Sequence, residues 1–364
     1  MFCNRLNNTL HYCRVPLVQV FIIGIVLVVT SLNSPAREKL QNDLFSVTFP
    51  TAMDGWACGR WGSVLHTADG GKTWERQQSG TDFTLSSIYF IDSKTGWAVG
   101  DGGTIIHTTD GGEAWTKQTG PQVTVEEGMR WGANNEAPEK QTKDMDFFLM
   151  DVYFKTSQKG WIVTERTTIL TTENGGKTWE IQFSDEDFIL KSISFCDGLN
   201  GWAVGEFGYI YHTDDGGQTW QHQAGYFDIS DETGEMVGGN FLFDVVALDP
   251  QTAWAVGIDG YVIRTVDKGE SWEVFETGAP RTQLFCLEAD RNKSFFIGGA
   301  GIFLSSPDRG ITWGSPSFEP PITYGWIYDI TPRGVNGFVA VGKEGWVYLT
   351  DDKGLSWRRA GNGE

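Results

Sequence analysis

The chain has 364 residues and a formal net charge of −19. Nucleic-acid binding rests on Lys and Arg side chains that neutralise phosphates, so this acidic balance argues against a nucleic-acid partner and against attraction to anionic lipids. It favours a soluble domain that binds a neutral or basic partner. The five cysteines are too few and too scattered to predict a disulfide framework.

Residues 1–42 form a separate N-terminal module. An uncharged, mostly apolar run at residues 15–32 follows Arg5 and Arg14, and no acidic residue precedes it. This run predicts one hydrophobic helix that serves as a signal peptide or a signal anchor. Positive charge ahead of the run predicts export of the domain that follows, to the periplasm, a lumen or the cell exterior. We expect contact with a membrane only through residues 15–32.

Residues 43–361 are built from seven copies of one repeat. Each copy contains a pattern close to Ser/Thr-x-Asp-x-Gly-x-Thr/Ser-Trp, the Asp box, and the box tryptophans lie 41, 64, 41, 52, 41 and 44 residues apart. Four short runs rich in β-branched and aromatic residues accompany each box, separated by Gly and Asp. The repeat predicts an all-β fold, a seven-bladed β-propeller of four-stranded antiparallel blades, preceded by the hydrophobic helix.

The Asp box itself is predicted to be structural. Its acidic residue falls in the turn between the third and fourth strands, where a short side chain accepts backbone N–H bonds and the following glycine permits positive φ. The third copy has Asn instead of Asp, so the acceptor matters more than the charge. The box positions are Asp69, Asp110, Asn174, Asp215, Asp267, Asp308 and Asp352, with Trp74, Trp115, Trp179, Trp220, Trp272, Trp313 and Trp357.

Copies of one residue spread around a ring cannot converge on a single metal or substrate. This argument applies to the boxes and to His66, His107 and His212, which precede the box threonine in three blades. No zinc-protease, nucleophile-elbow or phosphate-loop motif occurs in the chain. We therefore expect no catalytic residue, no metal and no cofactor.

Two intervals between boxes are long because residues 121–146 and 226–240 are inserted between the last strand of one blade and the first strand of the next. With residues 314–323 they should emerge on the face opposite the boxes, and loops on a rigid scaffold are where binding usually resides. The alternative is that the insertions are merely solvated loops. The predicted partner-binding residues on this face are Arg60, Trp61, Arg130, Trp131, Arg166, Phe207 and Lys343.

Residues 96–115 and 201–220 both join Gly-Trp-Ala-Val-Gly to Asp-Gly-Gly and a box tryptophan. This unit resembles the photosystem II stability/assembly factor family, and the resemblance covers all seven repeats. It implies a seven-bladed propeller on the lumenal or periplasmic side that assists membrane-complex assembly without known catalysis. Photosynthetic members use an arginine-rich patch to bind a partner. Arg60 and Arg166 occupy suitable turns here, whereas acidic residues hold three matching turns.

The sequence also leaves two other classes open. Asp boxes occur in sialidases and in xyloglucan-cleaving hydrolases, and a glycosidase needs two carboxylates that face one sugar. The Phe-Arg-Ile-Pro motif of sialidases is absent, and the xyloglucanase cleft lies between two propellers, whereas this chain encodes one. We therefore expect a non-enzymatic, exported, monomeric scaffold or assembly factor that binds a protein. The alternatives are a sialidase-like or other glycoside hydrolase and an extracellular adhesion or surface propeller.

Overall fold

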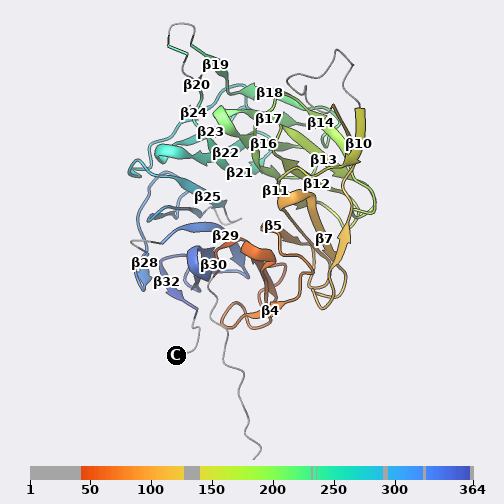
Figure 1. The fold of residues 1–364 in the computed structure, drawn as a ribbon. Helices are drawn as coiled ribbons and strands as arrows, with labels where there is room; N and C mark the ends of the chain where they lie inside the picture. Colours follow the sequence, from red (N-terminus) through yellow and green to blue (C-terminus); the bar gives the residue numbers. More distant parts are fainter. Residues whose placement is uncertain are drawn as a thin grey trace, which may run out of the picture. The chain divides into compact units, whose positions relative to one another are not determined.

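The computed structural model describes residues 42–126, 140–230, 233–234, 236–289, 294–322 and 325–360. Within them the protein is a seven-bladed propeller without α-helices (Figure 1), so the predicted fold class is confirmed. No helix in this part of the chain is long and apolar enough to span a membrane. The predicted helix at residues 15–32 lies outside the described residues, as do Arg130 and Trp131.

Five blades are four-stranded antiparallel sheets whose strands follow chain order. Blade one holds β1 (Leu44–Thr48), β2 (Gly55–Gly59), β3 (Val64–Thr67) and β4 (Glu75–Gln77). Blade two holds β5 (Leu85–Phe90), β6 (Gly96–Gly100), β7 (Thr104–Thr108) and β8 (Thr116–Gln118). Blade three holds β11 (Leu149–Phe154), β12 (Gly160–Thr164), β13 (Thr168–Thr172) and β14 (Glu180–Ser184). Blade four holds β15 (Leu190–Phe195), β16 (Gly201–Gly205), β17 (Ile210–Thr213) and β18 (Gln221–Ala224). Blade five holds β21 (Leu242–Asp249), β22 (Thr252–Gly257), β23 (Val262–Thr265) and β24 (Glu273–Val274).

The last two blades depart from the predicted four strands. Blade six has three, β25 (Leu284–Ala289), β26 (Phe295–Gly299) and β27 (Phe303–Ser306), and blade seven has five. Pro316 lacks the N–H that a fourth strand of blade six would need, so the chain leaves that edge. It forms β28 (Ser317–Glu319), which pairs in parallel with the outer strand of blade seven. Part of residues 314–323 is therefore an edge strand, and its prediction as a rim loop was wrong. The other strands of blade seven are β29 (Ile327–Arg333), β30 (Gly337–Gly342), β31 (Val347–Thr350) and β32 (Ser356–Arg359).

The two predicted insertions are hairpins between blades. One consists of β9 (Gln122–Glu126) and β10 (Lys140–Asp144), and the other of β19 (Phe227–Ile229) and β20 (Met236–Gly238). They share one face with the turns between second and third strands, which we call the loop face. The opposite, Asp-box face carries the seven boxes. Short 3-10 turns on the loop face are η1 (Arg60–Gly62), η2 (Asp101–Gly103), η3 (Glu206–Gly208), η4 (Ile258–Gly260) and η5 (Lys343–Gly345).

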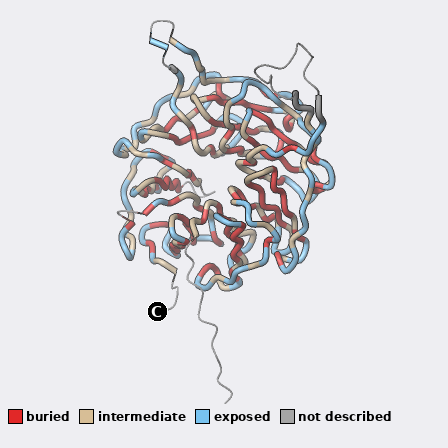
Figure 2. Tube along the Cα trace, in the orientation of Figure 1, coloured by how far each residue is buried: buried red, intermediate tan, exposed pale blue. Residues whose placement is uncertain are grey.

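The core lies between neighbouring blades. The first strand of each blade contacts the first strands of both neighbours, so these strands form a closed ring around the axis. The second strands are almost completely buried. In the first three blades the tryptophan of this strand stacks on a phenylalanine of the next blade, and the ring centroids of Trp97 and Phe154 are 3.5 Å apart. Figure 2 shows this buried interior inside an exposed perimeter. Each repeat therefore buries its apolar faces only through its neighbours.

Candidate partner-binding face

The carboxylates of the Asp-box face are occupied by their own turns. Asp215 accepts hydrogen bonds from the Thr219 N–H at 2.9 Å, the Thr219 hydroxyl at 2.7 Å and the Thr213 hydroxyl at 2.9 Å. At the equivalent Asp267, the hydroxyl and backbone N–H of Ser271 lower the pKa to about 2. Asn174 makes the same backbone contact, because its Oδ1 accepts the Thr178 N–H at 2.9 Å. These oxygens are therefore engaged within the fold.

The box tryptophans also pack into the structure. Trp74 and Trp313 donate their indole N–H to the carbonyl of a box glycine, Gly71 or Gly310, at 2.9 Å in both cases. Trp179, Trp220 and Trp357 are buried. The Asp-box face thus presents side chains that hold turns and strand edges together.

The cations predicted on the loop face are each held over an aromatic ring. Arg60 lies 5.6 Å from the Phe45 ring centroid, Arg166 lies 4.7 Å from that of Phe147, and Lys343 lies 5.9 Å from that of Trp326. Such contacts are worth about 0.5–1 kcal/mol at exposed sites. Each of these three cations is therefore engaged by a ring of its own chain.

Asp43 joins two of the predicted turns and was missed in the sequence. Its carboxylate accepts the Arg60 Nε–H at 2.8 Å and the backbone N–H of Glu344 at 2.9 Å. Blades one and seven therefore present Arg60 and Lys343 from adjacent turns. Asp43 precedes the first strand, and no spacing in the sequence relates it to η5.

Phe207 lies in an aromatic cluster at the base of the second hairpin. Its ring centroid is 5.2 Å from that of Phe188, 4.7 Å from that of Phe227 and 5.0 Å from that of Phe241. The Thr167 N–H bonds to the Phe188 carbonyl, which ties this cluster to the turn that carries Arg166. Phe207 is half-buried and acts mainly as an anchor for the hairpin.

A second aromatic group, which we call the axial arc, follows the first strands of blades five, six, seven and one. Ring centroids lie 5.7, 5.6, 6.1 and 5.1 Å apart from one member to the next. Four members occupy the position at which the strand register shifts, where a bulge residue leaves the regular ladder. Sequence reasoning missed the arc because bulges leave no mark in the repeat spacing. Its members are Phe243, Phe285, Trp326, Tyr328 and Phe45.

In the first strands of blades three, five and seven, the residue after the bulge is a carboxyl that connects adjacent blades. Asp151, Asp244 and Asp329 each accept a backbone N–H from the first strand of the following blade, at 2.8 to 3.0 Å. The bond from Asp329 joins blade seven to blade one and so closes the ring. Burial raises the pKa of Asp244 to about 7 and that of Asp329 to about 8. These carboxyls have a structural task that the repeat pattern did not reveal.

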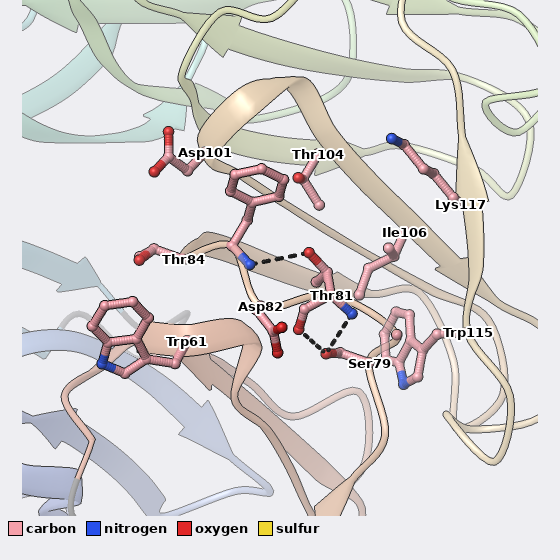
Figure 3. A pocket seen from close by; sticks show the side chains of 12 residues that line it. Trp61, Ser79, Thr81, Asp82, Thr84, Asp101, Thr104, Ile106, Trp115 and Lys117 are labelled. Carbon is pink, nitrogen blue, oxygen red and sulfur yellow. Dashed lines mark hydrogen bonds between the residues drawn. The ribbon is translucent and has the colours of Figure 1, made fainter.

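A pocket of about 710 Å³ lies between blades one and two on the loop face. Figure 3 shows Trp61 and Asp101 on one side of it, with Trp115 and Lys117 on the other. The linker between the blades, residues 79–84, forms its floor and contributes Asp82 and Phe83. Of the residues that line this pocket, the sequence had predicted Trp61 as a partner-binding residue and Trp115 as a structural box tryptophan.

Among the described residues, no group of three or more His, Cys, Asp or Glu side chains could hold a metal ion. His66, His107 and His212 each stack on the tryptophan of the neighbouring strand, with ring centroids 4.5 to 4.8 Å apart.

The chain matches the sequence profile of a protein family described as photosynthesis system II assembly factor YCF48, over residues 33–122, 133–224 and 232–362. A curated relative, the uncharacterized protein YkuO of Bacillus subtilis, is 34% identical over 80 residues. That match spans 22% of this chain and only 26% of YkuO.

Solved structures share the architecture at low sequence identity. One reported as YCF48 bound to D1 peptide is 18% identical, with a TM-score of 0.63 over 86% of this chain and 94% of that one. A GH74 xyloglucanase from Xanthomonas campestris is 9% identical, with a TM-score of 0.64 over 88% of this chain and 54% of the enzyme. At these identities the similarity shows the fold alone.

Proposed function

The chain belongs to the photosynthesis system II assembly factor YCF48 family, and from this membership we propose that it is a protein-binding scaffold that serves as an assembly or stability factor for a membrane or exported protein complex. The family resemblance predicted from the repeat is thereby confirmed. A relative of the same fold has been solved with a D1 peptide bound, which supports an extended peptide as the form in which a client is recognised.

One observation carries the proposal to the loop face. Exposed aromatic rings concentrate there, including Trp61 at 65%, Phe83 at 53% and Trp326 at 43% exposed, while the carboxylates of the opposite face are bound within their turns. Exposed aromatic side chains that cluster on one face are typical of protein interfaces. We infer that the client docks on the loop face.

The proposal includes a non-enzymatic role. The carboxyls with raised pKa, which a hydrolase would need as general acids, lie at the axis and hold blades together. Incubation of the full chain with xyloglucan and sialoside panels tests this point. We expect no sugar release. If sugar is released, and Asp82→Asn or Asp101→Asn abolishes the release, the protein is a glycoside hydrolase and the non-enzymatic proposal is wrong.

We also propose that residues 15–32 export the propeller or anchor it outside the cytoplasm. The proposal rests on the charge bias around that run. A fusion of alkaline phosphatase to the C-terminus of the full chain should be active in cells. An inactive fusion, with activity restored only when residues 1–42 are replaced by a known signal peptide, would contradict export.

Docking is tested by affinity purification of the tagged full chain from its source cells. The variant Trp61→Ala/Trp326→Ala removes two exposed rings from the loop face, and Ile311→Ala/Leu355→Ala removes two exposed apolar side chains from the Asp-box face. We expect one membrane or exported protein to co-purify, to bind again after separate purification, and to be lost only with the first variant. Equal recovery with both variants would contradict the face assignment.

A further inference from the structure

We propose that the pocket between blades one and two is a binding site for an arginine side chain of an extended basic peptide. The proposal rests on the protein-binding function above and gives that function a partner chemistry. Four side chains form the site: the rings of Trp61 and Phe83 and the carboxylates of Asp82 and Asp101.

Trp61 presents an exposed ring from a turn shared by several blades. Its φ is 56°, and the equivalent residues Gly102, Phe207, Asp259 and Glu344 have φ between 53° and 60°, so the turn itself requires this conformation. The turn therefore forms with glycine or with polar residues and does not require a tryptophan. The Trp61 ring is 65% exposed, so it is not part of the core either.

Trp61 differs from the rings on the loop face that have a cation of this chain over them. Arg60, Arg166 and Lys343 each cover a ring on the same face. Within the described residues, the Trp61 ring has neither a cation nor another ring against it. The molecule thus uses cation–ring contacts repeatedly on this face and leaves this ring open to a cation from outside.

The side chain of Asp101 is one methylene shorter than glutamate, so its carboxylate does not reach the backbone N–H that glutamates bond in two other blades. Glu165 and Glu206 stand at the same turn position in blades three and four, and each accepts the backbone N–H of the residue before the first strand, at 3.1 Å. The backbone around this position is the same in the three blades. The N–H groups of Asp101, Glu165 and Glu206 donate to the carbonyls of Thr84, Phe148 and Ile189, at 2.9 Å in each case. No hydrogen bond or ion pair to the Asp101 carboxylate is found among the described residues.

Asp82 adds a second free carboxylate from the linker. The described part of the chain offers it neither a hydrogen bond nor an ion pair, and it is exposed beside Trp61 (Figure 3). Two carboxylates next to two aromatic rings match a guanidinium, which stacks on ring faces and forms directed bonds to carboxylates. Lys117 lies on the far side of the pocket and would repel a second cation, so the pocket holds one guanidinium, at the end that contains Trp61 and the two carboxylates.

The floor of the site is rigid. The Ser79 hydroxyl donates to the Gly62 carbonyl at 2.7 Å, and the Phe83 N–H donates to the Thr81 hydroxyl at 3.1 Å. A Cβ on Gly62 would lie 1.8 Å from the Thr81 carbonyl oxygen, so the linker passes directly against the turn that carries Trp61. The backbone that carries Trp61, Asp82 and Phe83 is therefore fixed before a ligand arrives, which lowers the entropy lost on binding.

The test compares two fluorescein-labelled peptides on the full chain by fluorescence anisotropy at physiological ionic strength. One is a Gly/Ser decapeptide with two arginines, and the other replaces both arginines with citrulline, which keeps the shape and removes the charge. We expect the arginine peptide to bind about tenfold more tightly, as contacts of the cation–ring and exposed ion-pair type allow. Equal binding of the two peptides would overturn the proposal.

Variants locate the preference. Asp82→Asn/Asp101→Asn should reduce the ratio of the two affinities to within about twofold, because both carboxylates that would pair with the guanidinium are removed. Trp61→Ala should weaken the arginine peptide and reduce the same ratio. The control is Asp259→Asn, which removes an exposed carboxylate of the loop face that does not line the pocket. A ratio unchanged in the double variant, or reduced equally by Asp259→Asn, would show nonspecific attraction to an acidic protein and overturn the site.

The two proposals fail separately. If the client co-purifies with the Asp82→Asn/Asp101→Asn variant as well as with the parent chain, and the peptides show no difference, the scaffold function stands and the arginine site falls. If no client is recovered while the arginine preference and its variants behave as expected, the site stands without the assembly role.

Discussion

The two faces of the propeller use their carboxylates in opposite ways. On the Asp-box face each acidic side chain accepts up to three hydrogen bonds from its own turn, as Asp215 does, and the arrangement is nearly the same in every blade. On the loop face the equivalent turns carry different residues, and Asp82 and Asp101 keep their charge free. A repeated, satisfied motif maintains the fold, whereas the irregular positions are the ones free to bind.

The tryptophans show the largest contrast between fold and surface. Trp202 in the second strand of blade four is completely buried, so Trp202→Ala should lower the free energy of unfolding by about 3–5 kcal/mol. Trp61→Ala should change it by no more than about 0.5 kcal/mol, because that ring is exposed. Urea unfolding of both variants measures the difference. A loss of several kcal/mol in Trp61→Ala would mean that this ring supports the fold.

The second contrast is between carboxylates. Asp215→Ala leaves a box turn without its acceptor and should cost about 1–3 kcal/mol. Asp259→Ala, in the corresponding exposed turn of the loop face, should stay within about 0.5 kcal/mol. Similar losses in both would show that the two faces do not differ in the way described.

The pH dependence separates the axial carboxyls from the boxes. The folded pKa of Asp329, about 8, lies above its value in the unfolded chain, so its protonated form stabilises the fold and this contribution is lost as pH rises from about 4 to 8. Asp267, with a folded pKa of about 2, contributes stability above about pH 4 and loses it as pH falls toward 2. The two groups therefore act in opposite pH windows.

Thermal unfolding of the parent chain and of Asp329→Asn, measured from pH 5 to pH 8, tests this. The unfolding temperature of the parent minus that of the variant should fall steadily as pH rises, because only the parent carries the carboxyl that loses its proton. The buried histidines titrate in both proteins and cancel in the difference. A constant difference across the range would show that Asp329 does not change protonation there.

The smallest effect concerns Asp101. Asp101→Glu gives blade two the side chain that blades three and four have in this turn, and it should accept the Thr84 N–H as Glu165 accepts that of Phe148. We expect a gain of about 0.5–1 kcal/mol in unfolding free energy, together with a weaker preference for the arginine peptide. Stability gained without any change in peptide preference would dissociate Asp101 from the pocket.

Most of the fold was predictable from the sequence because one repeat unit fixes both the strands and their order. The boxes predicted the blade number, and the broken intervals located the two insertions, although the sequence did not predict that each forms a hairpin. The edge strand β28 was not predictable, since it pairs with β32 some forty positions further along the chain and follows from Pro316 leaving blade six. The repeat pattern contains only the features that all blades share, so it does not show that a segment after blade six pairs with blade seven.

The site was predictable only in part. Trp61 and Phe207 stood out because they place aromatic side chains in a turn where blades two, five and seven have Gly102, Asp259 and Glu344. Phe83 and Asp82 lie in a linker without a motif. They lie beside Trp61 because the Ser79 hydroxyl of that linker donates a hydrogen bond to the Gly62 carbonyl. The axial arc depends on a bulge in the first strands, which the spacing of the boxes cannot show.

Photo-crosslinking in living cells tests the difference between the faces most directly. A benzophenone amino acid replaces Trp61 on the loop face in one strain and Ile311 on the Asp-box face in another; the two side chains are 65% and 77% exposed. We predict a single covalent adduct, identified by mass spectrometry as a membrane or exported protein, from position 61 and none from position 311. An adduct from position 311, with none from position 61, would contradict the assignment of binding to the loop face.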